Sequence, residues 1–280
     1  MLPEQDPISH FDSSRRLEDR RPLQCLHLLY HELRPEKSNY SYVLDCEHFE
    51  KQVNLFAQFQ EAQDPGLWPE LTFDDGHISN YEYALPILQT RGIHARFFIT
   101  AGWTGRRIGY MGWDELRSLH QAGHPIGAHG WTHTLLTHCT KKELQLELNG
   151  ARQTLEDALG TPITTMSLPG GRFNRQVMDA CREAGYTEVY TSIPQVEPMP
   201  TGPVVGRLNI RGDRSLSWIA SLFTPGNKVL ANLQRQERIK AAAKTALGDR
   251  VYAKIWAILN GQETESRTGE ASPYEDSAHH

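Results

Sequence analysis

Short apolar runs alternate along this chain with longer stretches in which apolar residues recur every three or four positions. Runs of four to eight residues have the length of buried strands, whereas the three-to-four period places one apolar face on a helix. Strands are predicted at 25–30, 71–73, 95–100, 126–129, 165–168, 188–191 and 204–210. Helices are predicted at 48–60, 81–91, 113–121, 175–184 and 215–222.

The clearest helix begins at Thr140, which forms a capping box with Glu143 three residues later. One apolar stripe then runs along it, formed by Leu144, Leu148, Ala151, Leu155 and Leu159. Gly160 follows the stripe, and glycine commonly ends a helix because it adopts the left-handed conformation. We therefore expect one continuous helix over 140–159.

Alternating strands and helices indicate parallel strands joined by crossover helices. About seven such strands predict an α/β fold, specifically a distorted (β/α) barrel, whose catalytic groups lie where strands end. The barrel domain is predicted at 23–225, after a flexible segment at 1–22. Beyond it we expect a helical appendage on the barrel exterior at 226–261, with helices at 228–247 and 251–259, and a disordered tail at 262–280.

The composition of the chain limits the classes of binding partner that we expect. The net charge of −5 provides no basic surface for a phosphate backbone, so nucleic acid is not expected and a neutral polymer or small molecule fits better. The four cysteines form no CxxC pair and are predicted to be free thiols. No apolar stretch near the N-terminus resembles a signal peptide or a membrane span, which favours the cytoplasm.

Two motifs carry the candidate chemistry: Asp74 and Asp75 before Gly76, and His129 with His133. Each follows a predicted strand. Two imidazoles and one carboxylate can hold a divalent cation and leave a position open for water or substrate. If Asp75 joins the histidines, Asp74 is free to accept a proton from water that the cation has acidified. The alternative is an ordinary Asp-Asp-Gly turn and a chance pair of histidines.

These motifs resemble the polysaccharide deacetylase family, the NodB-homology domain of carbohydrate esterases. The similarity includes TFDDG at 72–76, HxxxH at 129–133 and the Gly-x-x-Ala-x-Phe-Phe segment at 92–98, and it extends over about 23–223. It implies that Asp74 is the general base, and that Asp75, His129 and His133 bind a divalent metal. Zn²⁺ is expected, and Co²⁺, Ni²⁺ or Fe²⁺ would also suit these ligands.

The implied reaction removes an acetyl group from an N-acetylated sugar. The family's oxyanion loop matches 167–171, which places the amide of Gly170 at the oxyanion and Pro169 beside the substrate. The family's arginine in this loop is replaced here by Ser167. Arg172 or Arg207 is a candidate substitute, and we favour Arg207 because it lies on a predicted strand; a structural ion pair is the alternative.

Two further family elements have no match. The Asp-x-x-x-Trp element is absent near 187–194, and the late Leu-x-x-His element that carries the general acid is missing. A proton donor is still required because an amine leaves poorly as an anion. His31, preceded by Tyr30 at the first strand end, is the leading candidate, since a branch of the family has a similar Tyr-His. His77 and His138 are weaker candidates.

Trp103, Trp113 and Trp131 are candidates for stacking against sugar rings, with Trp131 favoured because it lies between the two histidines; core packing is the alternative. Tyr30 is also expected to contact substrate. The main hypothesis is a metal-dependent N-deacetylase. The alternatives are hydrolysis of another C–N or ester bond, as in cyclic imides or acetylated xylan, and a carbohydrate-binding protein without catalysis. The sequence does not specify an oligomeric state.

Overall fold

The computed structural model describes residues 24–61, 67–226 and 228–247. All seven predicted strands are present. The strands are β1 (Gln24–Tyr30), β2 (Glu32–Arg34), β3 (Val43–Asp45), β4 (Trp68–Phe73), β5 (Ala95–Ile99), β6 (Ile126–Ala128), β7 (Thr165–Ser167), β8 (Glu188–Tyr190), β9 (Val196–Pro198), β10 (Val204–Val205) and β11 (Arg207–Asn209).

The helices predicted within the described residues are present as well, two of them interrupted. The α-helices are α1 (Cys46–Glu61), α2 (Leu85–Gln89), α3 (Trp113–Gln121), α4 (Lys141–Gln145), α5 (Ala151–Leu159), α6 (Arg175–Glu183), α7 (Leu216–Leu222) and α8 (Val229–Leu247). Two wider, π-helical turns are η1 (Asn80–Ala84) and η3 (Leu146–Gly150), and two 3₁₀ turns are η2 (Leu136–His138) and η4 (Pro169–Gly171). The helix expected at 140–159 is therefore broken by η3, and the helix expected at 81–91 begins with η1.

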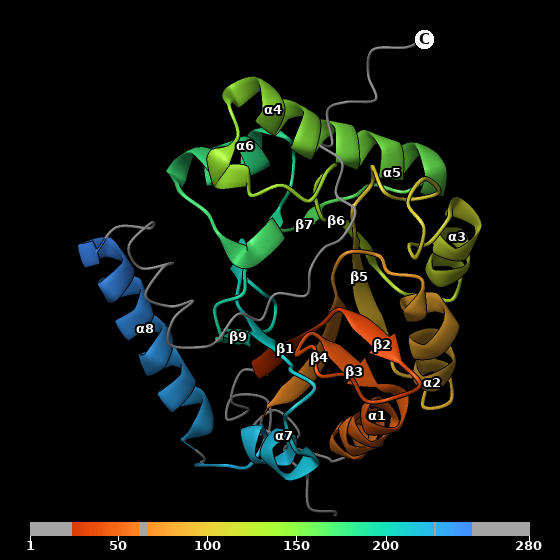
Figure 1. Ribbon diagram of the computed structural model, residues 1–280, viewed down its shortest axis with the longest axis vertical. Helices are drawn as coiled ribbons and strands as arrows, with labels where there is room; N and C mark the ends of the chain where they lie inside the picture. The colour runs from red at the N-terminus through yellow and green to blue at the C-terminus, as the bar shows by residue number, and fades with distance from the viewer. Residues whose placement is uncertain (1–23, 62–66, 227, 248–280) are drawn as a thin grey trace, which may run out of the picture.

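The main sheet curves into a nearly closed barrel (Figure 1). Parallel strands follow the order β10-β8-β7-β6-β5-β4-β1-β11, and β9 adds an antiparallel pairing to β1. β10 and β11 are separated only by Gly206, yet β10 pairs with β8 and β11 pairs with β1. One interrupted strand thus joins the two ends of the sheet, which confirms the predicted α/β barrel.

Successive side chains of a strand point to opposite faces, so each barrel strand has an outer and an inner row. On β1, Leu26, Leu28 and Tyr30 belong to the large hydrophobic core that the helices cover. The inner row carries polar groups: Arg207 on β11 contacts Thr72 on β4 and Ser167 on β7 across the barrel. The barrel interior therefore contains buried polar side chains directly below the strand ends.

The pattern did not predict the two-stranded sheet β2–β3 or strand β9. All four cysteines are free thiols, as predicted. Helix α8 matches the helix expected at 228–247, and Val229, Leu230 and Leu233 at its start pack against the core. The segments predicted at 1–22, 251–259 and 262–280 lie outside the described residues, and the division into domains stays a prediction.

Among the described residues, every helix is too short or too polar to cross a bilayer. The cytoplasmic location expected from the sequence stays a prediction.

Candidate active site

The two carboxylates and two histidines of the motifs meet at the carboxyl ends of β4 and β6, which lie on either side of β5 in the sheet. Asp74 and Asp75 directly follow β4, and His129 directly follows β6. The chain turns sharply at both places, because Asp75 has φ 75° and His133 has φ 63°. A left-handed conformation at a residue other than glycine costs of order 1–3 kcal/mol and persists only where the surroundings fix it. Backbone strain is therefore concentrated at two of the four motif residues.

Asp75, His129 and His133 form a compact triangle whose ligand atoms lie within 4.8 Å of one another. Oδ1 of Asp75 lies 3.3 Å from Nε2 of His129 and 3.1 Å from Nε2 of His133. Nδ1 of His129 lies 2.8 Å from the carbonyl oxygen of Ser167. Since a carbonyl only accepts, Nδ1 carries the proton, and in the neutral ring the lone pair of Nε2 lies on the side of the triangle, where a cation can accept it.

This donor set fits a divalent cation. Ligand atoms about 2.0–2.2 Å from a tetrahedral zinc ion lie roughly 3.3 Å apart. The distances from Oδ1 of Asp75 to the two ring nitrogens, 3.3 and 3.1 Å, are close to this spacing. The site also favours positive charge: burial alone would lower the pKa of His129, but Asp74 and Asp75 outweigh it and hold that pKa above its usual value. Burial likewise opposes ionisation of Asp75, yet the two histidines keep its pKa well below the usual range.

Asp74 points into the barrel and is held by Arg207 in a bidentate ion pair. Nη1 of Arg207 donates to Oδ1 over 2.7 Å, and Nη2 donates to Oδ2 over 2.8 Å. The hydroxyl of Ser167 also donates to Oδ2 at 2.8 Å. Burial would raise the pKa of Asp74, but Arg207 and His129 outweigh it, so the pKa lies below its usual value. Oδ2 lies 3.8 Å from Nε2 of His129, so this carboxylate adjoins the ligand triangle.

A cavity of about 420 Å³ opens over the four motif residues. That volume is within the range of sites that bind small ligands or one end of a polymer. Its wall includes polar and aromatic side chains from several loops. The lining residues beyond the motifs are Leu29, His31, Glu32, Tyr40, Tyr42, His77, Arg107, Tyr110, Leu168, Gly170, Ser192 and Asn209.

The three candidate proton donors differ in position. His31 lines the cavity, and its buried Nδ1 has no hydrogen-bond partner among the described residues. Burial lowers the pKa of His31, while Asp75 and Asp74 oppose that effect. His77 also lines the cavity, but its Nδ1 is 2.8 Å from the hydroxyl of Ser79. His138 is exposed on η2 and lies outside the cavity lining.

The predicted oxyanion loop forms the 3₁₀ turn η4. Gly170 lines the cavity and has φ 63°, and a Cβ atom on it would lie 2.7 Å from Cδ2 of Leu135. Glycine is therefore required at this place for both backbone and steric reasons. Pro169 is the buried first residue of the turn and is not part of the cavity wall, so its position does not support direct contact with substrate. Arg172 is exposed, and Arg207 alone of the two candidates reaches Asp74.

Tyr30 and Trp131 do not line the cavity, so the prediction that they contact substrate is not supported by their positions. Tyr30 is 1% exposed, donates its hydroxyl to Gln52 and stacks on Phe73, so it is a core residue and not a cavity residue. The indole of Trp131 packs so close to Gly102 that a Cβ atom there would lie 3.0 Å from its Nε1. Trp131 is also absent from the cavity lining.

The other two candidate tryptophans, Trp103 and Trp113, are likewise outside the cavity wall. The ring of Trp103, however, lies 5.2 Å from the ring of His133 and packs against this candidate metal ligand. Trp113 begins α3 and packs on the hydrophobic core.

Several residues in or next to the site are not part of the sequence motifs and were not predicted. Glu147 is buried and accepts hydrogen bonds from the loop that carries His133. A signal existed, because Glu147 lies three residues after Leu144 and four before Ala151, on the apolar stripe of its helix. Asn209 was detectable as the second residue after Arg207, on the same face of the strand. The aromatic and charged residues on the loops carry no such periodic signal.

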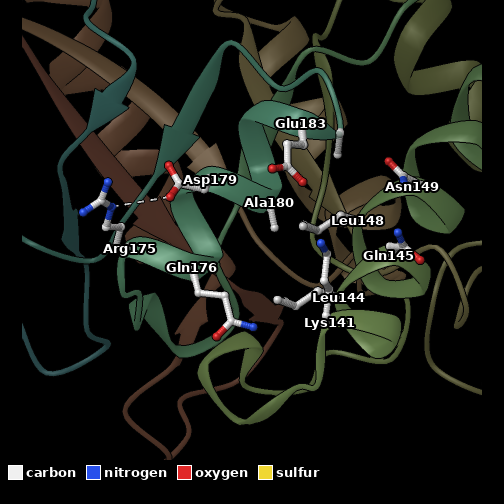
Figure 2. A pocket seen from close by; sticks show the side chains of 11 residues that line it. Lys141, Leu144, Gln145, Leu148, Asn149, Arg175, Gln176, Asp179, Ala180 and Glu183 are labelled. Carbon is white, nitrogen blue, oxygen red and sulfur yellow. Dashed lines mark ion pairs between the residues drawn. The ribbon is translucent and has the colours of Figure 1, made fainter.

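A larger cavity, of about 620 Å³, lies between α4, η3 and α6 on the outside of the barrel (Figure 2). Its lining includes Lys141 and Glu183 on opposite helices, and the ion pair between Arg175 and Asp179 lies along one helix. It contains none of the motif residues. Among the described residues, the triangle of Asp75, His129 and His133 is the sole cluster of potential metal ligands.

The barrel, the two carboxylates at the end of β4 and the two imidazoles after β6 define this chain as an α/β-barrel protein with a candidate metal centre. Residues 69–189 match the family model of polysaccharide deacetylases. The chain is 28% identical over 129 residues to chitin deacetylase 1 of Cryptococcus neoformans, covering 46% of this chain and 26% of that protein. It is 31% identical over 110 residues to the peptidoglycan-N-acetylglucosamine deacetylase PgdA of Listeria monocytogenes, covering 39% of this chain and 22% of that protein.

The fold is shared with the Streptococcus pyogenes deacetylase PplD, solved in complex with acetate, at a TM-score of 0.64 and 18% identity. This likeness covers 73% of the present chain and 100% of PplD. The chain spans less than half the length of the curated relatives it matches. The match of residues 69–189 to this family model agrees with the resemblance predicted from the motifs, and the shared fold agrees with the predicted barrel.

Proposed function

We propose that this chain is a metal-dependent hydrolase that removes the N-acetyl group from an amino sugar in a carbohydrate substrate. The observation that carries the proposal is the triangle of Asp75, His129 and His133 on the floor of the cavity, with Asp74 beside it. The names of two relatives, a chitin deacetylase and a peptidoglycan-N-acetylglucosamine deacetylase, support the substrate class.

The triangle would hold the cation, for which Zn²⁺ is the first choice and Co²⁺, Ni²⁺ or Fe²⁺ are the alternatives. When bound, such a cation supplies Lewis acidity toward the acetyl carbonyl and toward water. The hydrogen bond from His129 to Ser167 keeps the ring in the tautomer that presents Nε2 to the cation. The carboxylate of Asp75 would compensate part of the added positive charge.

Asp74 would act as the general base. Arg207 keeps it ionised and fixes both oxygens, so the carboxylate is ready to accept a proton next to the ligand triangle. The same ion pair makes Asp74 a weaker base than a free carboxylate. The position of Asp74 next to the triangle, where a bound cation would acidify water, would compensate for this weakness.

His31 and Gly170 would act on the departing amine and on the developing oxyanion, respectively. His31 lines the cavity with a ring nitrogen that lacks a partner in the described part of the chain, and it is therefore our candidate to protonate the departing amine. Gly170, on the opposite loop, would direct its amide toward the developing oxyanion. These two loops come from β1 and β7, so the substrate would lie between them.

Release of acetate from N-acetylglucosamine oligomers tests the proposal. We expect acetate to appear with added Zn²⁺ and to stop with a chelator, with activity restored by metal. Acetylated xylan and a cyclic imide serve as comparison substrates for the alternative reactions. Absence of hydrolysis of every substrate with every metal would contradict the proposal and favour a carbohydrate-binding protein.

Asp74→Asn tests the base directly. The variant keeps the size of the side chain but cannot accept the proton, so turnover should fall about 10²- to 10⁴-fold while Zn²⁺ is still bound. Zn²⁺ content and acetate release are measured on the same preparation. Asp114→Asn, an exposed aspartate on α3, is the matched control and should keep full activity. Turnover that survives in Asp74→Asn would exclude Asp74 as the base.

A further inference from the structure

The loop that carries His133 is held on both of its sides. It leaves β6 through Gly130, which has φ 78°, and reaches His133, which has φ 63°. On its carbonyl side, the amides of Ala101 and Gly102 donate to the oxygens of Gly130 and Trp131 over 3.1 and 3.0 Å. The amide side faces away from those partners and needs an acceptor of its own.

Glu147 supplies that acceptor from the helix α4–η3–α5. Its Oε2 accepts from the amides of Trp131 at 2.7 Å and Thr132 at 3.0 Å, and its Oε1 accepts the hydroxyl of Thr132 at 2.6 Å. A Cβ atom on Gly130 would lie 2.9 Å from Oε2, so the close approach requires glycine there. One carboxylate thus binds the two residues that directly precede His133.

Several features show that this contact is specific to the loop. Glu147 is 2% exposed, and no ion pair joins it to a cationic side chain in the described part of the chain. The loop donors therefore take the place of water around its charge. Glu147 also lies within the π-helical turn η3, where the helix widens and both Glu147 and Leu148 are buried. Such turns occur frequently at functional sites.

We propose that Glu147 is a positioning residue that holds the loop 130–133 in the shape that places His133 on the cation. This inference rests on the proposed function, because it assumes that the triangle binds a metal. Without the carboxylate, two amides lose their acceptor and the left-handed conformation of His133 loses its support. His129 would keep its own hydrogen bond to Ser167, so the effect should fall on one ligand.

Zn²⁺ affinity of the full chain, measured by competition with a fluorescent chelator, tests the proposal. Glu147→Ala should weaken Zn²⁺ binding about 10- to 100-fold. Glu147→Gln should retain most of the affinity, because its amide oxygen can accept from both amides and the hydroxyl of Thr132 can turn to accept from its NH₂. The visible absorption of the Co²⁺-substituted protein should change in Glu147→Ala and remain close to wild type in Glu147→Gln.

Glu156→Ala is the matched control. Glu156 lies on α5, and its Oε1 accepts from the amide of Ile163 at 2.9 Å and from Arg152 at 2.9 Å, away from the loop. This control should lower thermal stability without changing Zn²⁺ affinity. If Glu147→Ala does not fold, Thr132→Val replaces it, since it removes only the hydroxyl donated to Glu147 and should weaken binding in the same direction.

Glu147→Ala or Thr132→Val with wild-type Zn²⁺ affinity and Co²⁺ spectrum would overturn the proposal. A wild-type chain that binds no Zn²⁺ would overturn the metal centre and this inference together. A wild-type chain that binds Zn²⁺ but releases no acetate would contradict the proposed function alone, because the affinities of the variants still test Glu147.

Discussion

Arg207 has the largest side chain among the fully buried residues, and each of its nitrogens is engaged. Besides the two bonds to Asp74, Nη1 donates to Thr72, Nη2 donates to Ser167 and Nε donates to the carbonyl of Thr191. The ring of Phe98 lies 5.2 Å from the guanidinium. An arginine from β11 thus pairs with Asp74 where the family pattern has an arginine at the place of Ser167.

We expect Arg207→Met to lower the free energy of unfolding by about 3–5 kcal/mol, because it leaves a buried carboxylate without its partner. Urea unfolding at pH 7 measures this loss. Arg182→Met is the control: Arg182 is an exposed arginine paired with Asp179 on α6, and its removal should change stability little. Equal stability of the two variants would show that Asp74 does not depend on Arg207.

At the scale of elements, the two π-helical turns share one property. Each contains a buried polar side chain that binds the backbone of a site loop: Glu147 in η3 binds the loop before His133, and Nδ2 of Asn80 in η1 donates to the carbonyl of His31 over 2.7 Å. Apolar periodicity predicts both helices but not the wider turns, since one extra residue in a turn leaves the stripe recognisable. The turns allow a polar group to reach inward from an otherwise apolar face.

Asn80→Ala should therefore impair catalysis while leaving the metal in place. Loss of the bond to His31 frees the loop after β1, and misplacement of a proton donor by about 1 Å can reduce turnover about 100-fold. Acetate release and Zn²⁺ affinity are compared for this variant and for Asn149→Ala, whose asparagine is exposed. A fall in Zn²⁺ affinity equal to the fall in turnover would place Asn80 in metal binding instead.

At the scale of the whole molecule, the barrel interior combines polar side chains with the buried cluster of Phe98, Tyr190 and Val205. His27 on β1 is 5% exposed, lies 3.3 Å from Sγ of Cys25 and meets the ring of Tyr190 edge-on. Burial, together with the positive charges of Arg207 and Arg96, lowers the pKa of His27 to about 3. The folded barrel therefore holds this histidine neutral.

Because His27 is neutral in the folded state, the free energy of unfolding depends on pH. Between about pH 6.5 and pH 3, the unfolded chain binds a proton at His27 and the folded chain does not, so lowering the pH destabilises the fold by up to about 1.4 kcal/mol per pH unit through this side chain. His27→Phe keeps a ring against Tyr190 but cannot be protonated. Urea unfolding at several pH values should give a shallower slope for the variant, and parallel slopes would contradict the prediction.

The sequence by itself determined the strands of the barrel other than β9, the helices around them and the four residues at the mouth of the barrel. Periodicity is a local property: it selects which backbone forms a strand or helix, and parallel strands then bring their carboxyl ends to one edge. Asp75, His129 and His133 therefore meet once the strand assignments are correct. The helix at 113–121 was predicted with the same bounds that the structure has.

The tertiary structure decided which side chains meet from distant segments. Arg207 and Asp74 are separated by 133 residues, and only the return of β11 to β1 brings them together. Packing also placed Tyr30 in the core and Trp131 against Gly102, where local sequence left both free to face substrate. Closure of a barrel depends on the register of every strand at once, and no local pattern contains that information.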